Sequence, residues 1–291
     1  MRLAIAEDSG LFRSSLALLL EASGAQVTSS TASGTELLSA IGSLSVAAAV
    51  RYRGNHRTWR GFPLARPRES PMARRTLPIA GGHMGKTDIW PTVHAERKAL
   101  SADLRTLGKD QWATESLCAG WSVRDVLAHM TAAALMTPPS FFAKLAASGF
   151  SFGGVQDKGI AAQKGASPAD TLARFDSVLT SVKHPPGPAD TMLGETIIHS
   201  EDIRRALGIS RAYPAQAMVQ AADFFKGSNL LIGAKNRIAG LRLRATDTEW
   251  SYGDGPEVSG PILSLVMAMT GRKAPVDDLS GDGVATLRSR S

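Results

Sequence analysis

The segment GETIIHSEDIRRALG, residues 194–208, places a carboxylate and an imidazole on one helix. Its pattern is typical of a buried helix, and Glu195 and His199 lie four residues apart on it. Residues at i and i+4 point to the same side of a helix, one turn apart. The two side chains could therefore form a hydrogen-bonded contact in the core. Alternatively, they could supply two ligands of a metal site that needs a third.

A third ligand must come from another apolar helix face, and one of the six histidines meets this condition. His129 lies in VRDVLAHMTAA, among apolar residues. The other histidines lie in an arginine-rich segment, in a proline-rich loop or beside charged residues: His56, His83, His184 and His94. Two imidazoles and one carboxylate suit a catalytic divalent metal such as zinc. Spacing alone is equally compatible with a satisfied core contact, so both interpretations stay open.

Residues close to this pair in the sequence could support such a site. Asp202 follows His199 by three positions and could accept a hydrogen bond from its ring, or it could pair with Arg205. Arg204 and Arg205 could hold an anionic substrate, although basic residues also suit the last turn of a helix because of the helix dipole. Cys118, the single cysteine, precedes a helix cap, and we predict a structural role for it.

Helices must position these side chains, and residues 84–211 are rich in helix signals. Ser122 and Asp125 have the spacing of a capping box, and Ser167, Pro168 and Asp170 repeat this pattern. We expect four main helices, within residues 89–108, 122–136, 167–182 and 188–208, and a shorter one around 138–150. These helices predict a bundle, and residues 212–291 predict a small α/β domain.

Composition limits the class of protein. The chain has 291 residues, of which 43% are hydrophobic and 20% are charged, as is ordinary for a globular protein. Its apolar runs are too short to span a bilayer, and no stretch has the order of a secretory signal. A single cysteine excludes an internal disulfide. We therefore expect a cytoplasmic protein with no membrane partner.

The net charge of +7 comes from one segment. Residues 51–83 contain eight arginines and one acid, Glu69, and so account for the whole excess. This segment is rich in Arg, Pro and Gly and lacks apolar periodicity, which predicts a disordered linker. Because the charge does not belong to a folded face, we expect no nucleic-acid partner.

Residues 1–50 alternate strand and helix patterns and resemble the start of a response-regulator receiver domain. Glu7 and Asp8 would end the first strand, where receivers hold part of an acidic metal pocket. A receiver also needs a phospho-accepting Asp after its third strand, yet no Asp occurs between Asp8 and Asp88. We interpret the segment as a partial receiver, and a signalling protein of the response-regulator type is an alternative function.

From about residue 89 to its end, the chain resembles the mycothiol-dependent maleylpyruvate isomerase family, a branch of the DinB-like helical bundles. The phrases LCAGWSVRDVLAHM, GETIIHSEDIRRALG and LSGDGVATLRSR carry the resemblance and occur in the family's order. It implies a mainly α fold, a DinB-like four-helix bundle with a small, sterol-carrier-like α/β domain at the C-terminus. The metal ligands of the family fall on His129, Glu195 and His199.

The resemblance also implies a function. The expected cofactors are a divalent metal, Zn²⁺, and mycothiol as thiol cosubstrate, and the expected partners are this thiol and a small organic substrate. The expected reaction is isomerisation of the maleylpyruvate type or a related thiol transfer, and a metal-binding bundle without catalysis is a further alternative. The expected domains cover residues 1–50, 51–83, 84–211 and 212–291. The sequence does not specify the substrate or the oligomeric state.

Overall fold

The computed structural model describes residues 2–6, 26–31, 49–51, 88–149, 151–229 and 232–291. The linker predicted over residues 51–83 lies outside the described residues, apart from Arg51. Glu7, Asp8 and the helices predicted within residues 1–50 also lie outside them.

Three short strands are described near the N-terminus: β1 (Arg2–Ala6), β2 (Gln26–Thr31) and β3 (Ala49–Arg51). They form a parallel sheet in the order β2-β1-β3. The first two strands lie where the sequence predicts them. The third ends at an arginine, where a receiver domain would carry its acceptor aspartate.

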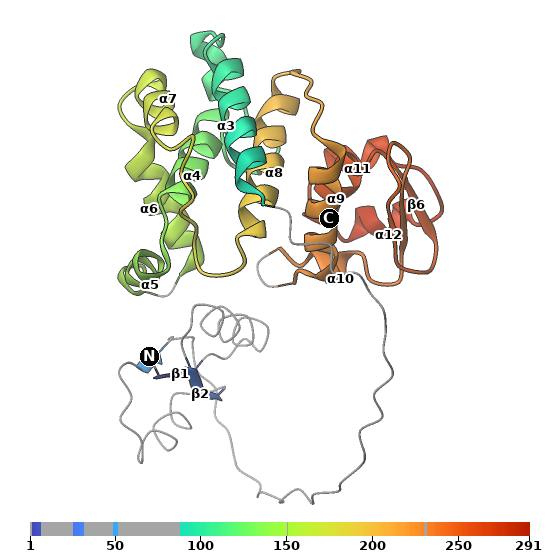
Figure 1. The fold of residues 1–291 in the computed structure, drawn as a ribbon, viewed down its shortest axis with the longest axis horizontal. Coiled ribbons are helices and arrows are strands. Elements are labelled where there is room, and N and C mark those ends of the chain that lie inside the picture. Colours follow the sequence, from blue (N-terminus) through green and yellow to red (C-terminus); the bar gives the residue numbers. More distant parts are fainter. Residues whose placement is uncertain (1, 7–25, 32–48, 52–87, 150, 230–231) are drawn as a thin grey trace, which may run out of the picture.

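The helical part begins at α3 and contains the predicted helices, together with a helix at residues 152–164 that the sequence did not predict (Figure 1). Its helices α3, α4 and α8 lie side by side, with α6 and α7 packed against α4 on one flank and α9 packed against α8 on the other. The elements are α3 (Trp90–Leu104), η1 (Lys109–Ala113), α4 (Val123–Ala134), α5 (Pro138–Ala147), α6 (Phe152–Lys164), α7 (Pro168–Asp176), α8 (Asp190–Ala206) and α9 (Ala215–Gly227).

Local signals in the sequence explain where these helices begin and end. Ser122 caps α4 and forms a capping box with Asp125, and Ser167 caps α7 in the same way with Asp170. These caps satisfy backbone N–H groups that have no partner inside the helix. Helix α3 ends at Leu104, earlier than the predicted residue 108, because the chain turns there into the short helix η1.

The C-terminal part, residues 212–291, adds a small mixed sheet and short helices to α9. Its strand order is β5-β4-β6, with β5 antiparallel and β6 parallel to β4. Residues 253–256 connect β5 to β6 along the chain, but β4 lies between these two strands in the sheet. The elements are α10 (Ala234–Arg237), β4 (Arg242–Ala245), β5 (Ser251–Tyr252), β6 (Glu257–Gly260), α11 (Ile262–Met269), η2 (Ala274–Asp278) and α12 (Val284–Ser289).

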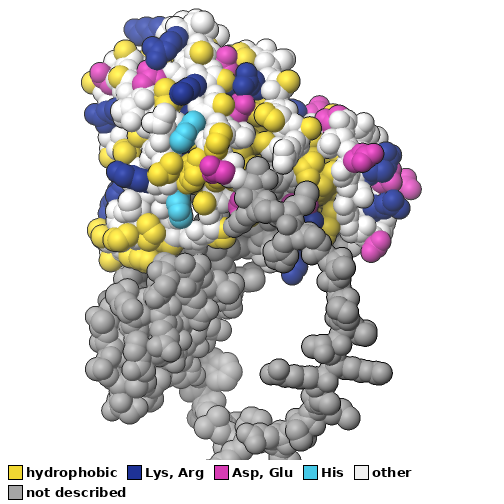
Figure 2. All heavy atoms as spheres, viewed as in Figure 1, with side chains coloured by type: hydrophobic (Ala, Val, Ile, Leu, Met, Phe, Trp, Pro, Cys, Tyr) yellow, Lys and Arg dark blue, Asp and Glu magenta, His cyan; other side chains and the backbone are white. Residues whose placement is uncertain are grey.

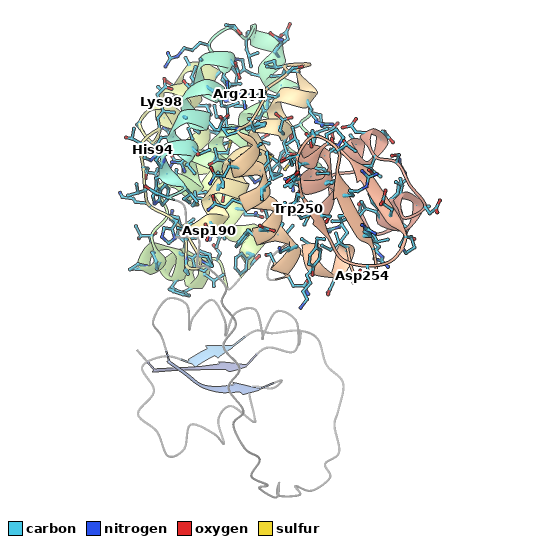
Figure 3. The ribbon with its side chains drawn as sticks, turned by 45° about the vertical axis from the view of Figure 1, so that its right-hand side comes forward. His94, Lys98, Asp190, Arg211, Trp250 and Asp254 are labelled. Atoms are coloured by element: carbon cyan, nitrogen blue, oxygen red, sulfur yellow. The ribbon has the colours of Figure 1, made fainter. Side chains whose placement is uncertain are left out.

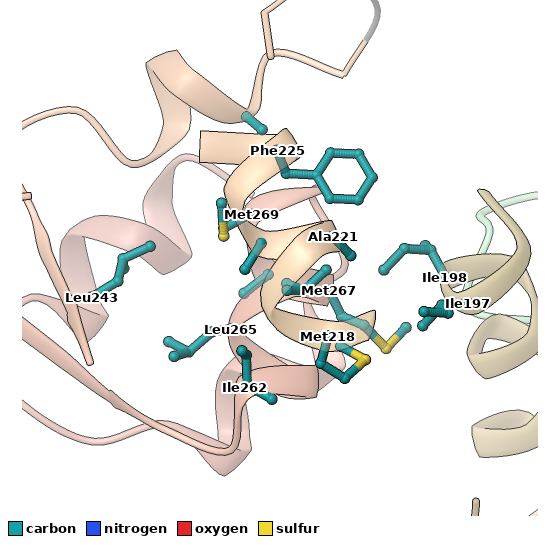
Figure 4. Packing of buried hydrophobic residues seen from close by; sticks show 14 of the residues in the cluster. Ile197, Ile198, Met218, Ala221, Phe225, Leu243, Ile262, Leu265, Met267 and Met269 are labelled. Atoms are coloured by element: carbon teal, nitrogen blue, oxygen red, sulfur yellow. The ribbon is translucent and has the colours of Figure 1, made fainter. Parts of the chain in front are cut away.

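The described residues form two hydrophobic clusters, one inside the bundle and one between α8 and the C-terminal part. Helix α8 connects the two parts because it contributes residues to both clusters. Ile203 packs with residues of α3, α4 and α7, whereas Ile197 and Ile198 face α9 and α11 (Figure 4). Gly194 permits this contact, since a Cβ at that position would lie 2.5 Å from the ring of Phe225 on α9. The predicted fold class, mainly α with a bundle and a small C-terminal α/β part, is confirmed. The domain boundaries stay predictions.

On the face in Figure 2, hydrophobic side chains gather over the middle of the described part, and basic and acidic side chains are interspersed around them. Among the described residues, no helix combines the length and the apolar character needed to cross a membrane.

Candidate metal centre

The three predicted ligands meet where α4 packs against α8. His129 projects from α4, and Glu195 and His199 project from α8. The Nε2 atom of His129 lies 3.8 Å from Oε1 of Glu195. The rings of His129 and His199 are nearly perpendicular, with centroids 4.9 Å apart. The structure therefore brings together two imidazoles and a carboxylate that are up to 70 positions apart in the sequence.

Trp121 covers these rings. Its centroid lies 4.9 Å from that of His129 and 6.5 Å from that of His199. It directly precedes Ser122, the cap of α4, so the start of the helix fixes the position of the indole. Nothing in the local sequence pattern of this residue links it to α8.

His199 is oriented by Asp202. The Nδ1 atom of His199 lies 2.9 Å from Oδ2 of Asp202. Because a carboxylate only accepts hydrogen bonds, Nδ1 carries the proton and Nε2 is the ring nitrogen available to a metal. Burial alone would lower the pKa of His199, but the hydrogen bonds with Asp202 and Cys118 outweigh it and raise the pKa to about 9. Metal binding would therefore displace a proton from Nε2.

Asp202 itself is fully buried and pairs with Arg272, not with Arg205. The guanidinium of Arg272 donates to both carboxylate oxygens, at 3.0 and 2.6 Å. Burial would raise the pKa of Asp202, but its hydrogen bonds from His199 and Arg272 hold that pKa well below its ordinary value. Asp202 is thus an anion at every physiological pH.

The donor set fits a divalent metal. Oε1 of Glu195 is shielded from solvent and has no hydrogen-bond partner, and burial raises the pKa of this carboxyl. An unpartnered buried carboxylate is costly, and 3.8 Å to His129 is too long for a hydrogen bond. Burial, followed by the positive charges of His199 and Arg272, lowers the pKa of His129 to about 3. This imidazole is therefore neutral and keeps a lone pair for a metal.

Among the described residues, the one group of three potential ligands whose donor atoms all lie within 4.8 Å of one another shares only His199 with the predicted set. It consists of Cys118, His199 and Asp202. However, the guanidinium of Arg272 lies 2.6 Å from Asp202 and 3.3 Å from the sulfur of Cys118. A cation at that point would meet this positive charge at short range. The electrostatics therefore favour a metal on the other side of the His199 ring, beside His129 and Glu195.

Arg204 and Arg205 are already neutralised by carboxylates. Arg204 is fully buried, and its Nε donates to Asp103 at 2.8 Å. Arg205 is about one quarter exposed and pairs with Asp278 at 2.7 Å. The guanidinium of Arg204 is fully buried in this structure, which does not favour binding of a substrate anion, and the hypothesis stays a prediction. Arg205 retains some exposure but no free charge.

The interpretation of His94 changes as well. We interpret His94 from its charged neighbours as a residue on a solvated face, but it is half-buried and its Nε2 is shielded without a partner. Its neighbours Glu96 and Arg97 are almost fully buried. Figure 3 shows His94 on the flank of the bundle that faces away from the C-terminal part, so it does not contribute to the candidate metal centre.

Comparison with known proteins bears on the family. Residues 93–184 match the model of the mycothiol maleylpyruvate isomerase N-terminal domain, a range that includes His129 and ends before Glu195. Two similar solved structures are crystal structures of the mycothiol-dependent maleylpyruvate isomerase and of a point mutant of it. Each is 17% identical, covers 66% of this chain and 91% of its own, and has a TM-score of 0.48. No curated protein sequence matched the chain.

The family model therefore supports the resemblance over residues 93–184, the range that contains the phrase LCAGWSVRDVLAHM, whereas the other two phrases lie outside the matched range.

Proposed function

We propose that this chain is a metal-dependent enzyme that uses a low-molecular-weight thiol, mycothiol, for isomerisation of the maleylpyruvate type or a related thiol transfer. One observation carries the proposal: Oε1 of Glu195 is buried without a partner beside a neutral imidazole. A divalent cation accounts for this group better than a core contact does, because a core contact would have paired the oxygen. The family match at residues 93–184 supports mycothiol as the thiol.

Each residue has a definite role in this proposal. His129, Glu195 and His199 would hold the ion, a donor set that suits zinc and leaves a position open. A divalent cation there would favour the thiolate form of an incoming thiol. Asp202 keeps the proton on Nδ1 of His199. The indole of Trp121 shields the two imidazoles on one side, which limits the access of water. We place the activity in the cytoplasm, where such thiols stay reduced.

The proposal is tested by loading the purified full-length protein with Co²⁺ and recording its visible spectrum. We expect stoichiometric binding and a spectrum that changes when mycothiol is added, because the thiol enters the open position. Isomerisation of maleylpyruvate should then depend on both the metal and mycothiol. Stoichiometric metal with no spectral response to mycothiol would instead support a metal-binding bundle without catalysis.

Removal of residues 1–83 should leave metal binding intact. All side chains of the candidate centre lie between Cys118 and Arg272, and they contact one another. A chain of residues 84–291 should therefore bind the same amount of metal and melt at nearly the same temperature as the full chain. Loss of metal from the shortened chain would show that the N-terminal segment belongs to the enzyme.

A further inference from the structure

The carboxylate of Asp202 receives hydrogen bonds from three different parts of the chain. Within α8 its Oδ2 accepts from Nδ1 of His199 at 2.9 Å. From the end of α11, Arg272 donates to the same oxygen at 2.6 Å and to Oδ1 at 3.0 Å. From the loop before α4, the thiol of Cys118 donates to Oδ2 at 3.1 Å. The carboxylate therefore has little freedom to rotate.

Both outer donors are themselves held in place. The backbone N–H of Arg272 donates to the carbonyl of Met267 in α11, and its Nη1 donates to the carbonyl of Thr270. The loop with Cys118 is fastened to α8, since the N–H of Leu117 donates to the backbone carbonyl of Asp202 at 3.2 Å. Arg272 also donates to the sulfur of Cys118 at 3.3 Å. These side chains thus form one connected network behind the His199 ring.

We infer that Arg272 and Cys118 are positioning residues of the metal centre, which fix Asp202 and through it the ring of His199. The inference rests on the proposed function, in which Nε2 of His199 is a metal ligand. Partners that orient a ligand imidazole set its tautomer and its direction, and their loss typically costs 10–100-fold in metal affinity. The C-terminal part of the chain therefore helps to build a site whose ligands all lie in the bundle.

A structural alternative is that Arg272 and Asp202 form an ion pair that only holds the C-terminal part against α8. That role predicts a loss of stability when Arg272 is replaced, with no specific effect on His199. Cys118 separates the two roles, because a thiol is a weak hydrogen-bond partner and contributes less to the docking of the C-terminal part than the ion pair between Arg272 and Asp202 does. Its replacement should perturb Asp202 while the protein stays folded.

The experiment compares zinc affinity, by competition with a chelator, in full-length wild type, Arg272→Gln, Arg272→Lys, Cys118→Ala and Cys118→Ser. Arg244→Gln is the matched control, because Arg244 forms an exposed pair with Glu257 in the same part of the chain. We expect zinc affinity to fall about 10–100-fold in Arg272→Gln. In Arg272→Lys it should fall by less, because the positive charge is kept, but it should still fall, because an ammonium cannot donate to both carboxylate oxygens as a guanidinium does. Cys118→Ala should lose less zinc affinity than Arg272→Gln, because a thiol is only a weak hydrogen-bond donor. Cys118→Ser, which keeps a donor, should recover most of the loss.

Nitrogen-15 spectra of the His199 ring provide a readout that docking alone would not move. In wild type we expect a protonated Nδ1, with and without zinc, and a shifted or exchange-broadened signal in Arg272→Gln and Cys118→Ala. An unprotonated Nδ1 in wild type would overturn the inference, as would wild-type zinc affinity in both variants. If wild type binds no zinc but the ring signal responds as expected, the proposed function fails while the positioning network stands.

Discussion

Glu195→Gln should abolish tight zinc binding and leave the metal-free protein at least as stable as wild type. The amide has the same shape as the carboxylate but lacks its charge, so it is a poor zinc ligand. We expect zinc affinity to fall more than about a hundred-fold, beyond the typical effect of losing an outer partner. Stability should not fall, because the substitution removes the charge of a carboxylate whose Oε1 is shielded from solvent without a hydrogen-bond partner. Chelator competition and thermal melting measure the two effects.

The control for this prediction is Glu257→Gln, an exposed position paired with Arg244, which should change neither property. His199→Ala should resemble Glu195→Gln in its loss of zinc, whereas His184→Ala, in a loop outside the centre, should bind zinc normally. A variant Glu195→Gln that keeps zinc but melts at a lower temperature would mean that Glu195 is an ordinary core contact.

Arg204→Met should lower the stability of the whole fold and leave zinc binding unchanged. Arg204 is fully buried, with Asp103 at 2.8 Å, the hydroxyl of Tyr213 at 2.8 Å and Glu96 at 3.9 Å. Removal of one partner from a buried charge network leaves the others uncompensated, which costs about 3–5 kcal/mol of unfolding free energy. We expect a clear fall in the melting temperature and, below that temperature, unchanged zinc binding.

Arg244→Met is the control, since Arg244 pairs with Glu257 at an exposed position. Pairs of that kind contribute at most about 1 kcal/mol, so its melting temperature should change little. If Arg204→Met instead retained full stability and raised the KM for an anionic substrate, the substrate-binding hypothesis for Arg204 would be supported.

Local patterns in the sequence predicted the parts of the site that depend on helix geometry. The four-residue spacing placed Glu195 and His199 on one face, and the search for a histidine on another apolar face found His129. Capping boxes predicted the starts of α4 and α7 because a cap depends on residues three positions apart. The spacing of Asp202 also suggested its contact with His199, although it did not exclude a pair with Arg205.

Contacts between segments that are distant in the sequence could not be predicted from such local patterns. Arg272 lies 70 positions beyond Asp202, and no spacing rule connects a turn after one helix with the middle of another. Cys118 is also distant in the sequence from Asp202 on α8, with which it forms a hydrogen bond, so this contact could not be predicted either. The burial of Glu96, Arg97 and Arg204 was missed because charged residues favour an exposed interpretation until their partners are known. Those partners come from other helices, from the loop after α8 and, for Arg97, from backbone carbonyls after α7.

A crystal structure of the zinc-loaded full-length protein, with anomalous data at the zinc edge, tests the central claim most directly. The account predicts one strong anomalous peak between α4 and α8, with donor atoms of His129, Glu195 and His199 about 2.0–2.2 Å away. The Nδ1 atom of His199 should remain hydrogen-bonded to Asp202. A peak bonded to the sulfur of Cys118 and the carboxylate of Asp202, with Arg272 displaced, would contradict the account.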